Sequence, residues 1–415
     1  MLARNSEIIK KIGIMMICIL LITPGCAKQE EKQEEKPVVT QEQSDLVAAE
    51  NDFAFSLLTK LYGQDTYTNT SISGTSAYIA LCMLANGAKS PCLEEMMTAM
   101  GLDGQDIKAI NQFNSKFIHK QYGDDISIVN SNSIWVGKDA MIVDDFANTV
   151  KTQYSATAEK IDFSDEKSPE TINSWVEKST NGKIKDLVNY DEIKDALMML
   201  INALYLKAPW TNTFNPKLTS DQDFVTLPGK PVKVKMMNRL GFYQYHKGDG
   251  FDIVRLPYGQ KEELAMYIVL PEAKDGLITL SEFFDRKEFE LQLAKMKDTE
   301  INLQLPRTKI EFEADLVPLL KKMGMNAIFD GSISDLSGMI ANPQNAFVSL
   351  IKHKTYINID EAGTEAAAVT AVEMVGSAAP GEKEPKEFKV DHPFMTIIRD
   401  EATGEVVFSA FVTEP

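Results

Sequence analysis

The stretch IDEAGTEAAAVTAVEMVGSAAPGEKEPKEF, residues 359–388, has unusually small side chains for a folded segment. Read with a period of two residues, one side of it is small and largely apolar: Thr364, Ala366, Ala368, Thr370, Val372 and Met374. The other side carries a glutamate at each end: Glu365, Ala367, Val369, Ala371 and Glu373. This alternation fits a strand that could enter a sheet. The same alanine-rich run also suits a helix that starts after Gly363, so the local sequence leaves both conformations open.

The whole chain has the composition of a globular protein, with 415 residues of which 44% are hydrophobic and 25% are charged. Its formal net charge is -17 at pH 7. Binding to nucleic acid requires clustered Lys and Arg side chains that release counterions from the phosphates. The acidic balance therefore argues against a nucleic-acid partner and mainly favours solubility.

The first 25 residues have the features of a signal peptide. Basic residues as far as Lys11 precede an apolar run over residues 12–22, which is shorter than the roughly 20 residues that a membrane-spanning helix needs. Gly25 directly before Cys26 resembles a lipobox, in which the cysteine is acylated and becomes the new N-terminus, although the two residues before Gly25 depart from the usual pattern. The alternative is an ordinary secretory signal that is cleaved nearby. In both cases we expect an exported protein, either anchored at the cell surface by a lipid on Cys26 or secreted.

Residues 26–47 are rich in Gln, Glu and Lys and poor in hydrophobic residues, which predicts a disordered tether. From residue 48 onwards no internal repeat is visible, and no comparable linker comes before residues 376–387. We therefore expect one large domain over residues 48–415. Its two cysteines, Cys82 and Cys92, could form a disulfide, but Cys82 stands in a helix-like apolar run, and we expect two free or buried thiols.

Hydrophobic periodicity predicts an α+β fold, with helices in the first part of the chain and large antiparallel or mixed sheets after it. Apolar residues at spacings of three and four predict helices over residues 46–62 and around residues 76–88. A third helix is expected to begin with Ser168 as its N-cap and to end at an Asn-Gly pair. After about residue 195, short apolar or alternating runs predict strands, and the last two form a hairpin around residues 400–404.

The chain lacks the sequence patterns of common enzymes. It contains no GxSxG, HExxH, P-loop or GxGxxG motif, and no Cys/His spacing that is typical of zinc sites. Of its four histidines, His119 and His246 stand among charged residues and are expected at the surface. His353 stands in an apolar strand, where it needs hydrogen-bond partners, and is either a satisfied core residue or a polar latch. We expect no enzymatic activity, no cofactor and no metal.

Short motifs spread from residue 48 to the end of the chain resemble the serpin family of serine-protease inhibitors. In chain order they are NDFAFSLL, SISGTSAYIALCMLANGAKSPCLEEM, NSIWVG, INSWVEKSTNGKIKDLV, LINALYLKAPW, FDIVRLPY, MYIVLP, LPRTKIEFEADL, LLKKMGMNAIF, IKHKTYINIDEAGTEAAAVTAV and HPFMTIIRDEATGEVVFSAFVTEP. Several matches in the right order are more specific than any one of them. The resemblance implies three β-sheets, about nine helices and an exposed reactive-centre loop. Two departures from the family pattern, Gly74 for a common proline and Ala208 for a glycine, lie outside the hinge.

The resemblance assigns the small-sided stretch to the hinge and the reactive loop. In this family a target protease cleaves the loop, which then inserts into the main sheet as a new strand before the acyl-enzyme is hydrolysed. Small side chains at the leading end favour insertion, because neighbouring strands must part and repack densely, and they favour an inhibitor over a non-inhibitory member. The residues carried over as the hinge are Glu361, Gly363, Thr364, Glu365, Ala366, Ala367, Ala368 and Thr370.

The family's spacing from Glu361 places the reactive bond between Ser377 and Ala378. The small residues around this bond favour a protease with a shallow, apolar primary pocket, such as an elastase-like or subtilisin-like serine protease, as the covalently trapped partner. The alternatives are a non-inhibitory serpin that acts as a binding module and a cross-class inhibitor of cysteine proteases. We expect the protein to be a monomer.

Two further groups of residues carry over from matching motifs. Ser73, Ser76, Asn202 and His353 align with the polar cluster beneath the main sheet that is called the shutter. This cluster would supply the hydrogen-bond partners that the histidine requires. Trp210 aligns with the aromatic residue of the breach, the point at which insertion begins, although an ordinary core tryptophan is an equally good interpretation.

Overall fold

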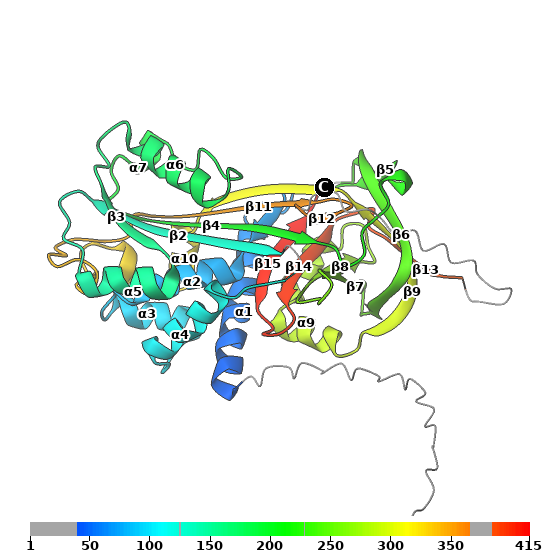
Figure 1. Ribbon diagram of the computed structural model, residues 1–415, viewed down its shortest axis with the longest axis horizontal. Coiled ribbons are helices and arrows are strands. Elements are labelled where there is room, and N and C mark those ends of the chain that lie inside the picture. Colours follow the sequence, from blue (N-terminus) through cyan, green and yellow to red (C-terminus); the bar gives the residue numbers. More distant parts are fainter. Residues whose placement is uncertain (1–39, 124–125, 228, 366–383) are drawn as a thin grey trace, which may run out of the picture. The chain divides into compact units, whose positions relative to one another are not determined.

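The computed structural model describes residues 40–123, 126–227, 229–365 and 384–415. These residues form one compact unit. Helices and two large sheets make up this unit, as Figure 1 shows, which confirms the predicted α+β class.

The main sheet has six strands in the order β10-β11-β12-β4-β2-β3. Their bounds are Thr308–Asp315 (β10), Leu350–Ile359 (β11), Gly363–Thr364 (β12), Met198–Pro209 (β4), Ser127–Gly137 (β2) and Thr157–Ile161 (β3). β4 and β11 run parallel and pair directly with each other, from Leu350 opposite Met199 to Tyr356 opposite Tyr205. β4 is buried over almost its whole length, as expected for an apolar strand at the centre of a sheet that is covered on both faces.

The second sheet has nine strands, in the order β1-β15-β14-β8-β7-β6-β9-β13, with β5 paired to β6. Their bounds are Thr70–Ile72 (β1), Val406–Val412 (β15), Phe394–Asp400 (β14), Leu264–Pro271 (β8), Phe251–Tyr258 (β7), Pro231–Lys247 (β6), Lys297–Pro306 (β9), Lys386–Lys389 (β13) and Ser220–Val225 (β5). β6 is 17 residues long and pairs with β5 near its start, with β9 along its middle and with β7 at its end. The three expected sheets therefore form two hydrogen-bonded networks among the described strands, because β6 joins two of them.

The described residues contain ten α-helices and two short 3-10 helices. The α-helices are Gln41–Tyr62 (α1), Gly74–Ala85 (α2), Cys92–Ala99 (α3), Ile107–Ile118 (α4), Asp144–Tyr154 (α5), Ser168–Ser179 (α6), Tyr190–Ile193 (α7), Leu277–Phe283 (α8), Arg286–Leu293 (α9) and Val317–Lys322 (α10). The 3-10 helices are Pro216–Leu218 and Ala327–Phe329. The predicted hairpin is present as β14 and β15, which pair antiparallel.

Helix α1 begins earlier than the sequence predicted. Thr40 and Gln43 form a capping box, in which each side chain accepts a hydrogen bond from the backbone N–H of the other residue. The helix therefore starts at Gln41, and the last seven residues of the predicted tether, 41–47, are helical. Leu46 and Val47 are already buried in the core, which gives this first part of the helix an apolar anchor.

Helix α6 begins with a cap different from the one predicted. Lys167 is its N-cap, and Ser168 is the first helical residue. The Ser168 hydroxyl donates to the carbonyl oxygen of Asp162 at 2.6 Å, so it fastens the preceding turn and does not cap the helix. After the helix, Asn181 and Gly182 adopt positive φ values of 53° and 77°, so the Asn-Gly pair ends it as predicted.

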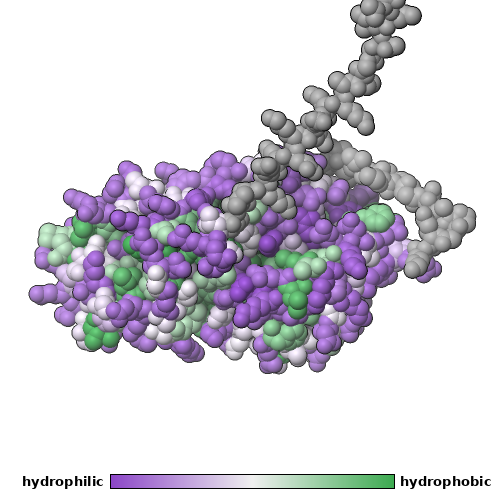
Figure 2. Space-filling model, turned by 90° about the horizontal axis from the view of Figure 1, so that it is seen from below, coloured by the Kyte–Doolittle hydropathy of each residue, from purple (hydrophilic) through white to green (hydrophobic). Residues whose placement is uncertain are grey.

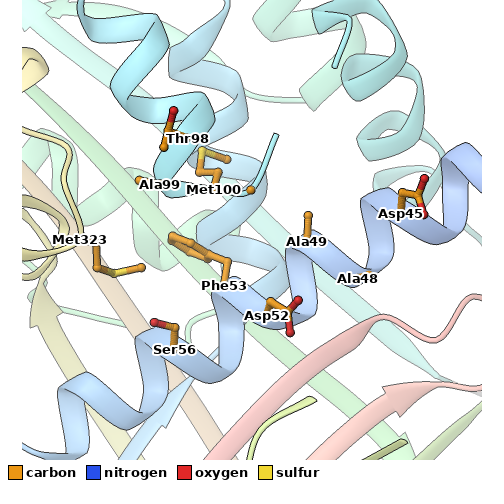
Figure 3. A pocket seen from close by; sticks show the side chains of 11 residues that line it. Asp45, Ala48, Ala49, Asp52, Phe53, Ser56, Thr98, Ala99, Met100 and Met323 are labelled. Atoms are coloured by element: carbon orange, nitrogen blue, oxygen red, sulfur yellow. The ribbon is translucent and has the colours of Figure 1, made fainter. Parts of the chain in front are cut away.

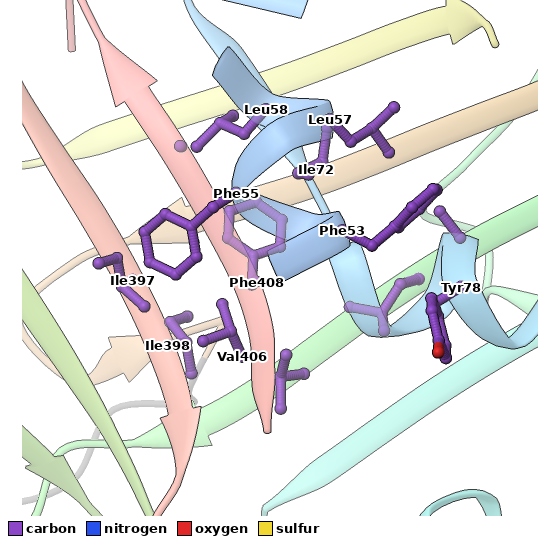
Figure 4. Close-up of a cluster of buried hydrophobic side chains, with 14 of the residues drawn as sticks. Phe53, Phe55, Leu57, Leu58, Ile72, Tyr78, Ile397, Ile398, Val406 and Phe408 are labelled. Atoms are coloured by element: carbon purple, nitrogen blue, oxygen red, sulfur yellow. The ribbon is translucent and has the colours of Figure 1, made fainter. Parts of the chain in front are cut away.

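Helices α1 and α2 pack against β14 and β15 at the centre of the core, as Figure 4 shows. The rings of Phe53 and Tyr78 meet edge to face with their centroids 5.6 Å apart. The two helices come so close that a Cβ atom on Gly74 would lie 2.1 Å from the Cβ of Ala54. This contact explains the departure from the family pattern at Gly74, because any larger residue would push α2 away from α1.

Cys82 and Cys92 are free and buried, as expected. Burial raises the pKa of the Cys82 thiol, which keeps it protonated and unreactive. On the face shown in Figure 2, hydrophilic residues dominate and hydrophobic residues form separate patches. Within the part of the chain that the structure describes, no helix is both long and apolar enough to cross a bilayer.

Candidate functional site

Two hinge residues lie in the main sheet. Gly363 and Thr364 form β12, which pairs antiparallel with β11 through Ile359 and antiparallel with β4 through Ala208 and Pro209. Beyond this point β11 and β4 pair with each other. These two hinge residues are therefore in the strand conformation, and the sheet is open at this end for the length of β12 (Figure 1).

Thr364 is held by a buried hydrogen bond. Its side chain is fully buried, and its hydroxyl shares a hydrogen bond of 2.7 Å with the Tyr258 hydroxyl on β7. The Tyr258 ring is stacked on Trp210, with the centroids 4.4 Å apart and the planes 10° from parallel. The stacked rings of Tyr258 and Trp210 therefore support Thr364 where it lies in the sheet.

Trp210 also contacts the hinge through two backbone carbonyls. Its backbone N–H donates to the carbonyl of Ala362 at 2.9 Å, and its indole N–H donates to the carbonyl of Asp360 at 2.9 Å. The structure thus places Trp210 beside the hinge residues, where the resemblance puts the breach. A buried indole N–H needs a hydrogen-bond partner in any core, so this bond fits both the breach and an ordinary core tryptophan.

Gly363 lies too close to β4 for any other residue. Its φ is +152°, and a Cβ atom at this position would lie 2.2 Å from the carbonyl oxygen of Ala208 and 2.7 Å from the Cα of Pro209. These are backbone atoms, which cannot move aside without shifting β4. The glycine therefore allows the hinge to pass against β4 and enter the sheet.

We expect the substitution Gly363→Ala to expel β12 from the sheet and to lower the free energy of unfolding by about 2–4 kcal/mol, because it creates a backbone clash and breaks the hydrogen bond of Thr364. Urea unfolding followed by circular dichroism measures the change. Gly104→Ala is the matched control, since Gly104 has a positive φ of 77° with open space around it, and should cost about 1 kcal/mol. Equal losses in the two variants would contradict the importance of the close approach.

Glu361 fixes the start of the hinge. Its carboxylate accepts a forked pair of hydrogen bonds from the guanidinium of Arg307, at 2.8–3.1 Å, and one from the Thr219 hydroxyl at 2.5 Å. Burial alone would raise the pKa of Glu361, but these hydrogen bonds outweigh it and lower the pKa below its ordinary value. The charged carboxylate therefore fixes the position of Glu361 at the start of the hinge.

Glu365 turns the chain out of the sheet directly after Thr364. It adopts a positive φ of 53°, and its backbone N–H donates to the carbonyl of Asn358. Its carboxylate forms an ion pair of 2.6 Å with Lys183, in the segment after α6, and accepts a hydrogen bond of 3.4 Å from the Tyr205 hydroxyl on β4. Further insertion requires Glu365 to leave this left-handed conformation for an extended one.

The four residues predicted as the shutter lie together in the buried space beneath the main sheet. The amide nitrogen of Asn202 donates to Ser76, at 2.5 Å to its hydroxyl and 2.9 Å to its carbonyl, and to the side-chain oxygen of Asn132 at 2.6 Å. The Asn202 side-chain oxygen lies 2.5 Å from Nδ1 of His353, and the Ser73 N–H donates to Nε2 at 3.2 Å. All five residues are buried. These hydrogen bonds connect β2, β4 and β11 to α2, across the strands that would part during insertion.

The partners of His353 define its charge. Because the Ser73 N–H donates to Nε2, this nitrogen carries no proton, and Nδ1–H donates to Asn202. The imidazole is therefore neutral. Burial lowers the pKa of His353 to about 4, in agreement with this assignment.

We expect the imidazole of His353 to titrate near pH 4 in an NMR titration. A basic group whose pKa is lowered by folding contributes stability above its unfolded pKa of about 6.5, and this contribution is lost as the pH falls toward 4. The loss amounts to about 3 kcal/mol. An imidazole signal of His353 that titrates near pH 6.5 would contradict the proposed hydrogen bonds.

Several predicted residues lie outside the described part of the chain. They are Cys26, the hinge residues Ala366, Ala367, Ala368 and Thr370, and the reactive-bond residues Ser377 and Ala378.

Sequence reasoning missed several residues that contact the site. Tyr258 and Arg307 stand within quoted motifs, FDIVRLPY and LPRTKIEFEADL, but nothing in their spacing connects them to a hinge more than 50 residues further along. Lys183 and Asn132 likewise come from distant segments. The one available signal was the presence of polar residues in otherwise apolar strands, such as Asn202 in LMMLINALYL.

A separate hollow of about 460 Å³ lies between α1, the end of α3 and Met323 (Figure 3). Phe53, Met100 and Met323 point toward it, and the carboxylates of Asp45 and Asp52 lie along α1 at its edge. Asp52 is paired with Arg286 at 2.8 Å. No predicted site residue lines this hollow. Among the described residues, moreover, no three His, Cys, Asp or Glu side chains gather as a metal site would require.

β12 lies between the parallel strands β4 and β11. This arrangement is expected in a protein whose loop can insert into its sheet as a further strand. The family model described as serpin (serine protease inhibitor) matches residues 48–415. The chain belongs to the serpin family.

Relatives in both sequence and structure cover nearly the whole chain. Serpin-Z2B of Triticum aestivum is 31% identical over 386 residues, covering 89% of this chain and 96% of the relative. An uncharacterized serpin-like protein of Thermococcus kodakarensis is 33% identical over 387 residues, covering 92% and 87%. The crystal structure of Serpin48, a highly specific serpin of the insect Tenebrio molitor, is similar with a TM-score of 0.81 and 27% identity, covering 91% of this chain and 100% of that one. The serpin fold is thus shown, and protease inhibition in general is supported.

Proposed function

We propose that the protein is a suicide-substrate inhibitor of serine endopeptidases, which traps its target when the cleaved loop inserts into the main sheet. The observation that carries this proposal is the arrangement around β12. β4 and β11 are parallel neighbours, and β12 begins a strand between them that is antiparallel to both. An inserted loop would continue along this path and would pair on both sides.

The mechanism follows from the contacts of the hinge. The serine of the protease attacks the carbonyl of the reactive bond, the new amine leaves, and the loop remains attached to the protease as an ester. The cleaved loop is then free to extend from Thr364, while Glu361 stays anchored by Arg307. Parting β4 from β11 requires the hydrogen bond between Asn202 and His353 to break. Insertion carries the protease away from its starting position, and a distorted oxyanion hole no longer stabilises hydrolysis of the ester.

We place the reactive bond between Ser377 and Ala378 on the family's spacing. Small residues on both sides of this bond fit a protease with a shallow, apolar primary pocket, such as an elastase-like or subtilisin-like enzyme. A trypsin-like enzyme needs Lys or Arg at the cleaved position, and the nearest such residue after the bond is Lys383.

The test uses the soluble chain from Ala27 onwards, incubated with pancreatic elastase, subtilisin, trypsin and papain. Denaturing gels detect covalent complexes, and mass spectrometry identifies the C-terminal fragment. We expect a denaturant-resistant complex with elastase or subtilisin and a fragment that begins at Ala378. A complex with papain would indicate cross-class inhibition. Cleavage in the loop by every enzyme without any complex would contradict the inhibitor and favour the binding module.

We further propose that the protein is exported and anchored through a lipid on Cys26. The basic start, the short apolar run and the Gly25-Cys26 pair support this location. Expression of the full chain with a radiolabelled fatty acid, beside the variant Cys26→Ser, tests it. Label in the wild type and not in the variant is expected, whereas an unlabelled, secreted wild type would favour the ordinary signal peptide.

A further inference from the structure

Two carboxyl groups are buried together where α1 crosses the turn between β14 and β15. Glu50 on α1 and Glu405 in the turn are 0% and 2% exposed. The neighbouring Asn51 fastens α1 to this turn, since its side chain donates to the carbonyl of Gly404 at 2.9 Å and accepts from the N–H of Val406 at 2.8 Å. Figure 4 shows the apolar surroundings, with Phe53 and Val406 beside this crossing.

The contacts of Thr75 bear on the protonation of Glu50. The Thr75 hydroxyl lies 2.5 Å from Oε1 of Glu50 and 3.0 Å from the carbonyl oxygen of Val406. A hydroxyl has one proton, so it cannot donate fully to both the Glu50 carboxyl group and the Val406 carbonyl. If Glu50 is protonated, its O–H donates to the Thr75 hydroxyl, which in turn donates to Val406, and both contacts are then hydrogen bonds. The other oxygen of Glu50, Oε2, is buried without a hydrogen-bond partner among the described residues, as suits a neutral carboxyl and not a carboxylate.

Glu405 has more polar surroundings. It accepts a hydrogen bond of 2.6 Å from the Thr403 hydroxyl. The carboxylate of nearby Asp400 accepts hydrogen bonds from Lys120, from the Tyr122 hydroxyl and from two backbone N–H groups of the turn. The Asp400 carboxylate lies close enough to repel a second charge on Glu405.

Within the described part of the chain, the titratable groups that face the pair are tyrosines, a cysteine, a lysine and Asp400. From α2, Tyr78 and Cys82 face Glu50, and burial raises the pKa of both well above neutrality. From the segment after α4, Tyr122 also has a raised pKa because of burial, and Lys120 is paired with Asp400. Burial raises the pKa of Glu405 to about 7 and raises that of Glu50 well above its ordinary value, in the same direction as the geometry.

We propose that Glu50 and Glu405 form a buried proton-binding site, in which Glu50 holds a proton at neutral pH and Glu405 gains one as the pH falls. The unfolded chain releases these protons near the ordinary pKa of 4.5. The native state therefore binds more protons than the unfolded state above this pH, and native stability falls as the pH rises. Because the site lies at the packing of α1 against β14 and β15, its protonation can be followed in the unfolding of the intact protein, a measurement that does not involve loop insertion.

The direct test is an infrared measurement of the carboxyl stretch at neutral pH. We expect a protonated-carboxyl band in the wild-type protein that is clearly weakened in Glu50→Gln, which preserves the shape of the side chain and can still donate to Thr75. Glu42→Gln, at an exposed position on the same helix, should leave the band unchanged. A wild-type protein without this band at neutral pH would overturn the proposal, and this result needs no variant to fold.

The second test is the pH dependence of unfolding between pH 5 and 8.5. Each bound proton changes the unfolding equilibrium constant by up to about tenfold per pH unit within its window. We expect the fall in stability with rising pH to be weaker in Glu405→Gln and lost in the double variant with Glu50→Gln, while Glu42→Gln follows the wild type. The comparison uses differences from the wild type, which remove the opposite contribution of His353. A double variant with the wild-type dependence would overturn the proposal.

Discussion

Replacement of Thr364 by arginine is expected to abolish trapping of a protease while the loop is still cleaved. Thr364 is fully buried, and its hydroxyl is bonded to Tyr258 beneath the sheet. An arginine side chain would bring a charge into this space without a partner, which costs about 3–5 kcal/mol. The hinge would then leave the sheet, and insertion would lose its starting point. The partition between trapping and hydrolysis should shift toward hydrolysis by two or more orders of magnitude.

The measurement is the number of inhibitor molecules consumed per protease molecule inactivated, together with the complex seen on a denaturing gel. Thr364→Ser is the matched control, because it keeps the hydroxyl that reaches Tyr258 and a small volume, and it should trap as well as the wild type. If the arginine variant forms the complex with unchanged stoichiometry, the contacts of β12 have no part in insertion.

The strand conformation of the hinge could be predicted from its sequence only in part. The alternation that starts at Thr364 fits a strand, but alanine suits a helix equally well, and local sequence does not say whether a sheet has room for another strand. The structure provides the reason for β12 at Gly363, where the contact with the Ala208 carbonyl excludes every side chain. This contact joins segments more than 150 residues apart, so no local pattern could reveal it.

The polar cluster beneath the sheet was found by resemblance and not by spacing. Ser73, Ser76, Asn202 and His353 lie on three segments that are distant in the chain, and the pairing of β4 with β11 brings the last two opposite each other. A polar residue in an apolar strand indicates that a partner exists, but it does not identify the partner. Asn132, the fifth member, was missed because β2 lies in the part of the chain where helices were expected.

Two boundaries show different causes of error. The capping pattern at Thr40 and Gln43 was readable in the sequence, but the polar residues before it suggested that the tether continued. The sequence could not predict that β6 joins two of the expected sheets. A 17-residue strand that changes partners along its length has no distinct sequence pattern.

Cleavage of the reactive loop is expected to raise the unfolding temperature of the wild-type protein by about 10 °C or more. The seven paired positions that join β4 to β11, from Leu350–Met199 to Tyr356–Tyr205, form a single parallel ladder in the intact protein. A strand inserted between them replaces this ladder with two antiparallel ones, a gain of roughly one backbone hydrogen bond for each inserted residue, worth about 1 kcal/mol each. A gain of several kcal/mol in a domain of this size raises the transition by about this much.

The cleaved variant Thr364→Arg separates insertion from the cut itself. Both proteins lose the same peptide bond, but the variant cannot seat its side chain at position 364 over Tyr258 and Trp210. Its unfolding temperature should therefore stay within a few degrees of the uncleaved value. Calorimetry of the four samples, intact and cleaved, measures the difference. β4 and β11 can part only if the hydrogen bond between Asn202 and His353 breaks. The rise in the unfolding temperature of the cleaved wild-type protein therefore indicates that the sheet has opened along its length. A cleaved wild type that unfolds at the same temperature as the intact protein would show that the loop stays outside, and would favour the binding module over the inhibitor.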